Sequence, residues 1–255
     1  MNDVELRGPR RDHFLVAVWQ TLARLLSPLG TLSLEVLLER DLTTTVEPIS
    51  TRLPVAIREA TDADLDRITF LYPQDPYLYL GDVPSSQLNN RNSDVDSEMV
   101  DRAVDPKARE QYRDRMRRGE KCFLALVGSE IAHVNWLCFS WGEAVPGHPI
   151  FLQPGEVYTT DAFTPDKFRG QNIHAYILSE MLRYAQNKGY LPAYTVTRLA
   201  SRASMHAFRQ LGWHTVGELL CFIPRRTDRY CWLLKLSGRI DPLLRQPSIA
   251  SRAGR

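Results

Sequence analysis

The sequence has few cysteines, little net charge and no long apolar run, and each shortage argues against a class of protein. Its four cysteines form no Cys-x-x-Cys pair, which argues against a zinc ribbon or a disulfide framework. Lysine and arginine total 32 against 30 acidic residues, and a net charge of +2 does not suit a protein that coats nucleic acid. No apolar stretch approaches the roughly 18 residues of a membrane span, so we expect a cytoplasmic protein. The cysteines lie in or beside apolar runs, so we expect them to be buried free thiols.

Near the N-terminus, apolar residues recur at the period of an α-helix, with Gln20 and Arg24 off the stripe. The stripe consists of Leu15, Val18, Trp19, Leu22, Leu25, Leu26 and Leu29. Because the polar face has few cations, packing on the protein's own core or on a partner subunit is favoured over a membrane surface. Residues 32–38 are a candidate strand and 43–54 a linker, so 1–53 are assigned to an N-terminal extension.

Residues 54–237 alternate short strands with helices, and residues 238–255 are predicted to be a polar tail. Thr61 and Asp64 have the spacing of a capping box, which predicts a helix carrying Leu65 and Ile68. The other predicted helices are 105–119, 172–188 and 201–211. The predicted strands are 55–57, 122–127, 131–139, 156–163, 193–199, 215–223 and 230–236. Residues 72–104 are polar and without a period, as in a lid or a disordered loop.

The predicted helix at 105–119 is rich in cations. It carries Lys107, Arg109, Arg113, Arg115, Arg117 and Arg118 against only two acidic residues. A solvated helix face is the favoured interpretation, and an anion-binding surface is the alternative.

A strand-to-helix turn at residues 164–174 has the make-up of a diphosphate site. The first N–H groups of a helix lack intrahelical acceptors and lie at the positive end of its dipole. Arg169 adds a charged donor there. This turn, Arg-Gly-Gln-Asn-Ile-His at 169–174, resembles the Arg/Gln-x-x-Gly-x-Gly/Ala motif of the GNAT superfamily of acyl-coenzyme A dependent N-acyltransferases. The segment 201–213 is similar to that family's Asn-x-x-Ser-x-x-x-Tyr/Phe-x-x-x-Gly-Phe helix.

The resemblance implies an α+β (three-layer α/β) fold: a twisted mixed β-sheet flanked by helices, here with an N-terminal helical extension. It also implies that the fourth and fifth strands of the family's sheet splay apart to admit the pantetheine arm. The cosubstrate would be acetyl-CoA or another acyl-CoA. The implied cofactor-binding residues are Ala162, Phe163, Arg169, Gly170, Gln171, Asn172, Ile173, His174, Ser204 and Phe208.

Four positions depart from the family pattern. Asn172 stands at a glycine position, but asparagine tolerates left-handed backbone, so we expect the turn to survive. His174 replaces a small residue and either disturbs the phosphate contact or offers an imidazole to it. Phe208 stands where many members have a tyrosine that protonates the thiolate. Ser201 replaces an asparagine and is expected to cap its helix.

Direct attack by an amine needs a group that takes up the ammonium proton. Asp161 is the favoured candidate base; Glu156, on the opposite face of a regular strand, is the alternative. His133 is a candidate relay or a structural histidine. Tyr158 is a candidate acid or a packing residue, although a thiol of pKa near 8.5 leaves without an acid.

The predicted function is transfer of an acyl group, acetyl by preference, to the primary amine of a small molecule or peptide. One alternative is a non-catalytic ligand-binding or interaction module. Another is an acyltransferase whose donor is an acyl carrier protein that meets the basic helix. We expect no metal and no nucleic acid, and a homodimer is left open.

Overall fold

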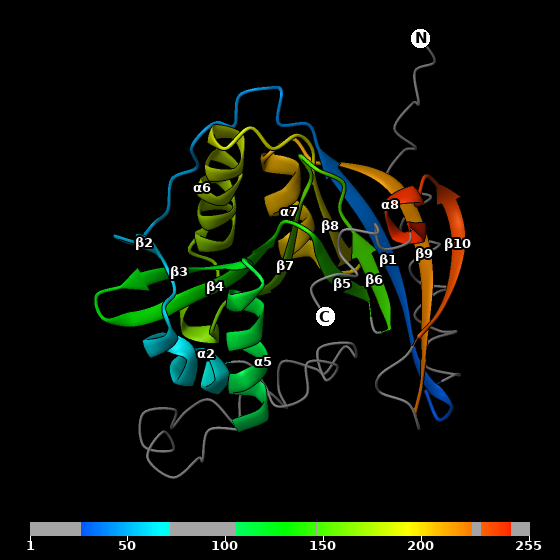
Figure 1. Ribbon diagram of the computed structural model, residues 1–255, viewed down its shortest axis with the longest axis horizontal. Coiled ribbons are helices and arrows are strands. Elements are labelled where there is room, and N and C mark those ends of the chain that lie inside the picture. The colour runs from blue at the N-terminus through cyan, green and yellow to red at the C-terminus, as the bar shows by residue number, and fades with distance from the viewer. Residues whose placement is uncertain (1–26, 72–105, 146, 226–230, 246–255) are drawn as a thin grey trace.

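A computed structural model describes residues 27–71, 106–145, 147–225 and 231–245. Most of the predicted N-terminal helix and the loop at 72–104 lie outside these residues. The described chain forms an eight-stranded mixed sheet in the order β10-β9-β1-β8-β7-β4-β3-β2, and β5 pairs separately with β6 (Figure 1). The strands are β1 Gly30–Arg40, β2 Ala56–Glu59, β3 Lys121–Val127, β4 Glu130–Cys138, β5 Trp141–Val145, β6 His148–Phe151, β7 Val157–Phe163, β8 Ala193–Arg198, β9 His214–Pro224 and β10 Trp232–Gly238.

Helices cover both faces of this sheet. They are α2 Leu65–Leu71, α5 Pro106–Arg117, α6 Ile173–Asn187, α7 Arg202–Gln210 and the short α8 Asp241–Leu244. One apolar cluster joins α6 and α7 to alternate residues of the strands, and it includes Val36, Ile177 and Phe208. A second cluster joins α2 and α5 to the other face through Ile68 and Trp136. The predicted fold class, a mixed sheet flanked by helices, is confirmed.

The predicted strand at 32–38 lies inside the main sheet. As β1 it pairs antiparallel with β8 on one side and with β9 on the other, and Val36, Leu37 and Leu38 are at most 2% exposed. Part of the N-terminal extension therefore completes the core. The domain boundary assigned after residue 53 remains a prediction.

Two elements were not expected from the sequence. One is the β5–β6 hairpin, in which the backbone of Gly142 lies against the ring of Tyr158. The other is α8, within the predicted polar tail, whose Pro242 and Leu243 are buried. Among the described residues, no helix is both long and apolar enough to cross a membrane.

Candidate active site

The parallel strands β7 and β8 pair over a short distance and then part. Their register consists of two pairs, Val157 with Ala193 and Tyr158 with Tyr194, although β7 continues to Phe163 and β8 to Arg198. One further link follows, from the Thr195 hydroxyl to the Thr159 carbonyl at 2.9 Å. Beyond it the facing edges of the two strands are not joined by a ladder. The splay implied by the GNAT resemblance is therefore present.

A β-bulge lies on β7 where the strands part. Phe163 pairs with Val134 and Thr160 with Trp136, so Asp161 and Ala162 together oppose a single residue of β4. Asp161 has a φ of 53°, which is rare for a residue other than glycine. Such a bulge redirects side chains and interrupts pairing. Asp161 and Ala162 are exposed there.

Asp161 is held by Arg115, a half-buried cation on α5. Nη1 of Arg115 lies 2.6 Å from its Oδ2, and Nε of the same guanidinium lies 2.7 Å from Oε2 of Glu120. Arg118 donates to the other oxygen of Glu120 at 2.8 Å, and the Cys138 thiol lies 3.3 Å from Oε2. The predicted base is thus one end of a charged network that ties α5 to the sheet.

An aromatic stack lies beside this network. The guanidinium of Arg115 sits 4.0 Å from the ring centroid of Trp136, a cation–π contact. Tyr112 stacks on Trp136 with ring centroids 5.6 Å apart. Burial, reinforced by the charge of Asp161, raises the pKa of Tyr112, so its hydroxyl stays protonated at neutral pH. The α5 side of the bulge is therefore lined by rings and a fixed cation.

On the other face of the sheet, two histidines contact each other. Nδ1 of His133 lies 2.6 Å from the Thr164 hydroxyl, and its Nε2 lies 3.3 Å from Nδ1 of His174. Burial lowers the pKa of His174 to about 4, and burial, with His174 as neighbour, lowers that of His133 well below its usual value. Both are neutral at pH 7. The His174 ring turns inward against Phe208, and its buried Nε2 has no partner within the described chain.

The turn before α6 has the backbone that the sequence predicts. Gly170 has a φ of 74° and Asn172 a φ of 64°, both left-handed. Asn172 therefore supplies the conformation for which the family uses glycine, and its side-chain amide donates to the Ser50 carbonyl at 2.9 Å. Left-handed residues that alternate with ordinary ones turn successive N–H groups toward one concavity, which suits a phosphate at the N-terminus of α6.

Arg169 folds back onto its own turn. Its Nη1 lies 2.5 Å from Oδ1 of Asp166, and its Nε donates to the Thr164 carbonyl at 3.2 Å. The guanidinium is 47% exposed, so a phosphate could reach it only in competition with Asp166. Of the neighbouring predicted residues, Gln171 is half-buried and Ile173 packs in the core.

Two of the predicted catalytic residues, Glu156 and Tyr158, are buried. Glu156 lies at the start of β7, where it accepts a hydrogen bond from the Gln153 N–H at 2.8 Å and pairs with Arg245. Asp161 lies five positions further along the chain, about 16 Å in a regular strand. Tyr158 is 1% exposed, and burial raises the pKa of its phenol. The Val196 backbone and the Thr160 side chain partly offset this rise in pKa.

The two predicted residues of the second motif lie on α7. Phe208 is 5% exposed and packs edge-on against Trp213 and His174, so it belongs to the core. Ser204 is paired with Ser201, whose hydroxyl donates to it at 2.8 Å. Ser201 stands at the N-cap position of α7 but makes no side-chain cap bond.

Arg115 and Glu120 were not recognisable as site residues from the sequence. Arg115 was one cation among six on its helix, and only the way α5 lies on the sheet distinguishes it. Its neighbours Arg109, Arg113 and Arg117 form ion pairs with Asp66, Asp62 and Glu110 respectively. These pairs fit the favoured interpretation of a solvated, ion-paired helix face.

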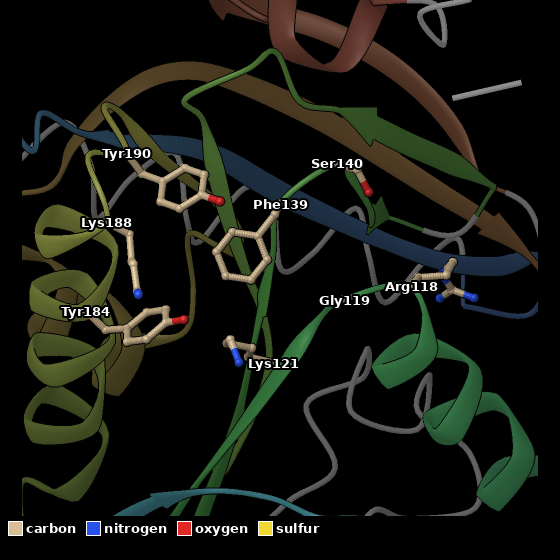
Figure 2. Close-up of a pocket in the computed structure, with 8 residues that line it drawn as sticks. All are labelled: Arg118, Gly119, Lys121, Phe139, Ser140, Tyr184, Lys188 and Tyr190. Carbon is tan, nitrogen blue, oxygen red and sulfur yellow. The ribbon is translucent and has the colours of Figure 1, made fainter. Parts of the chain in front are cut away.

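A pocket lies at the C-terminal end of α6. Figure 2 shows its lining, and its volume is about 360 Å³. The lining residues are Arg118, Gly119, Lys121, Phe139, Ser140, Tyr184, Lys188 and Tyr190. None of the site residues predicted from the sequence is among them. Within the described ranges, no cluster of histidine, cysteine and acidic residues could hold a metal ion.

No family model matches the chain, and no curated protein matches it. Solved structures of similar fold do exist. A GCN5-related N-acetyltransferase from Sphaerobacter thermophilus is 13% identical with a TM-score of 0.47, over 83% of this chain and 57% of that one. A ribosomal-protein-alanine N-acetyltransferase from Brucella melitensis is 19% identical with a TM-score of 0.48, over 71% and 96% of the two chains.

A GNAT-family acetyltransferase from Novosphingobium aromaticivorans is 9% identical with a TM-score of 0.48, over 76% of this chain and 65% of that one. The chain spans a little over half the length of the Sphaerobacter protein. The likenesses are distant, and the function proposed below rests on the residues and strand pairing of this chain.

Proposed function

We propose that this protein is an N-acyltransferase that moves an acyl group, acetyl by preference, from coenzyme A to a primary amine. The observation that carries the proposal is the parting of β7 from β8 after Tyr158 and Tyr194, next to the turn that starts α6. An extended, amide-containing arm can bind unpaired strand edges as an added strand does. Its diphosphate would then meet the N-terminus of α6.

The residues at the turn fit such a cosubstrate. Gly170 and Asn172 hold the left-handed backbone that exposes N–H groups, and the His174 ring points away from them into the core. Side chains of the turn therefore leave its backbone open to phosphate oxygens. We assign phosphate binding to the main chain of residues 170–174. Arg169 would add a contact only after its ion pair with Asp166 is broken.

In the proposed reaction the amine nitrogen attacks the thioester carbon and the carbon–sulfur bond breaks. Asp161 is the proposed acceptor of the proton lost by the ammonium, because its side chain is 45% exposed at the bulge. Arg115 fixes the position of that carboxylate. Tyr158, protonated and beside the parting strands, is the proposed proton source for the thiolate. The thiol pKa near 8.5 makes this last step the least demanding.

The test combines binding with turnover. Thermal unfolding is measured with saturating coenzyme A, acetyl-CoA and a long-chain acyl-CoA, and thiol release is then followed across a panel of amines. A ligand that binds only the folded state raises the midpoint. A rise together with amine-dependent thiol release supports the proposal. A rise without release from any amine supports a non-catalytic binding module, and no rise with any thioester contradicts coenzyme A as the donor.

A further inference from the structure

Three neighbouring strands, β1, β9 and β10, share an apolar face. The pairing register places large apolar side chains in two rows that cross the three strands. One row is Leu32, Phe222 and Trp232, and the other is Leu34, Leu220 and Leu234. We call these six side chains the apolar face.

No described helix covers the apolar face. Further along β1 on the same side, Val36 and Leu38 are 0% and 2% exposed and lie in the cluster under α6 and α7. Trp232 and Leu234, by contrast, are 64% and 59% exposed, and the other four are half-buried. Figure 1 shows α6 over the β3–β4 part of the sheet with α7 beside it, while β9 and β10 extend away from both helices. A contiguous exposed apolar patch of this kind marks an interaction surface.

The chain that enters this part of the sheet carries a matching surface. Immediately before β1 lies the amphipathic stripe of residues 15–26, which the function proposed above does not use. The Leu29 carbonyl accepts a hydrogen bond from the Arg225 N–H at 3.0 Å, and Gly30 pairs with Pro224. Leu29, where the segment joins the sheet, is three residues before Leu32. The segment therefore ends about 10 Å from the row that contains Leu32.

We propose that residues 15–26 pack as a helix, within the same chain, on the apolar face. Twelve helical residues extend about 18 Å, and three strands measure about 10 Å between the outer two, so one helix is long enough to cross all three. The three residues from Ser27 to Leu29 form a turn between helix and strand, and a short connection favours contact with the adjacent strands. A second copy of the chain and a membrane surface are the competing occupants.

The first test is a disulfide in the full-length protein. Leu22→Cys, on the stripe, is combined with Leu234→Cys, and the matched control combines Arg24→Cys, off the stripe, with the same partner. The native cysteines are buried and do not compete. We expect a disulfide within one chain that forms at least fivefold faster in the Leu22 pair at micromolar protein. Equal rates, or disulfides chiefly between two chains, would overturn the proposal.

The second test is side-chain footprinting of Trp232 in solution. We expect low labelling in the wild-type protein and at least threefold more in the Val18→Asp/Leu22→Asp variant, with Gln20→Asp resembling wild type. High labelling in all three proteins contradicts the proposal. Protection that disappears on dilution indicates a second copy instead, and protection that requires anionic phospholipid vesicles indicates a membrane. If the double aspartate variant does not fold, the disulfide test decides.

Discussion

Arg115 and Asp161, 46 positions apart in sequence, are joined by a contact of 2.6 Å between Nη1 and Oδ2. The guanidinium also donates to Glu120 at 2.7 Å, so one half-buried cation links the bulge of β7 to the residue before β3. The orientation of the proposed base is consequently set by α5, a helix outside both sequence motifs. Mutations of Arg115 or Glu120 should therefore act mainly on stability, and mutations of Asp161 mainly on the proposed reaction.

Arg115→Met is expected to lower the free energy of unfolding by about 3 kcal/mol, because it removes the ion-pair partner of Glu120. The Glu120 side chain is 5% exposed, so water cannot replace that partner. Urea unfolding checks this value. In the Arg115→Met/Glu120→Gln double variant, we expect a loss smaller than the sum of the two single losses by at least about 1 kcal/mol. Strict additivity would contradict the network described here.

Asp161→Asn and Glu156→Gln are expected to act on different properties. The first removes the proposed proton acceptor and should lower kcat by about 100-fold or more with little change in unfolding. The second weakens the buried pair with Arg245 and should lower stability by about 1–3 kcal/mol while kcat stays within about threefold. Thiol-release kinetics and thermal unfolding measure the two effects. The opposite pattern would assign the base to Glu156.

Asn172 is expected to be replaceable by glycine but not by alanine. At a φ of 64°, alanine pays the left-handed penalty of about 1 kcal/mol and also loses the bond to Ser50. We expect Asn172→Ala to be less stable than Asn172→Gly by about 1 kcal/mol, since both lack the side-chain amide. Thermal unfolding checks the order, and coenzyme A affinity should follow it. Equal behaviour of the two variants would show that the turn is not strained.

The buried histidines are expected to make the fold sensitive to acid. The pKa of His174 is lowered to about 4, whereas an unfolded chain takes up the proton near its ordinary value of 6.5. Between these values the unfolded state binds more protons, so the free energy of unfolding falls as the pH drops through this window. The contribution of His174 is about 3 kcal/mol and is lost below pH 6.5, with no further change below about pH 4.

Urea unfolding at a series of pH values measures this dependence. His174→Gln should flatten the fall between pH 6.5 and pH 4. The matched control is His206→Gln, on the exposed face of α7, which should keep the wild-type profile. A profile for His174→Gln that is indistinguishable from wild type would show that the imidazole is not buried in solution.

Local patterns were sufficient for much of the site. The strand at 156–163, the helix at 172–188 and the helix at 201–211 lie within one or two residues of β7, α6 and α7. The left-handed backbone at Asn172 was expected from the resemblance, whose motif has a glycine there, because asparagine tolerates that backbone better than most residues. These features depend on residues that are close in sequence, so they can be predicted without knowledge of the fold.

Contacts between residues far apart in the sequence could not be predicted from local patterns. The pairing of Arg115 with Asp161, the inward turn of His174 and the burial of Glu156 beside Arg245 depend on how helices and the C-terminal segment lie on the sheet. Asp161 was identifiable as an acid on a strand, but the bulge that exposes it is a mismatch between two strands and has no local signal. The missed β5–β6 hairpin packs on Tyr158 in the same non-local way.

The sequence by itself thus determined most of the strands and helices, because the hydrophobic period acts over a few residues. Together with the family motif, the φ preference of asparagine also indicated the left-handed backbone at residue 172. The tertiary structure alone decided that β1 completes the sheet between β8 and β9, and that β7 and β8 part where Asp161 emerges. Strand neighbours are chosen by the burial of whole faces and by ladder hydrogen bonds between distant segments, which depend on the folded chain as a whole.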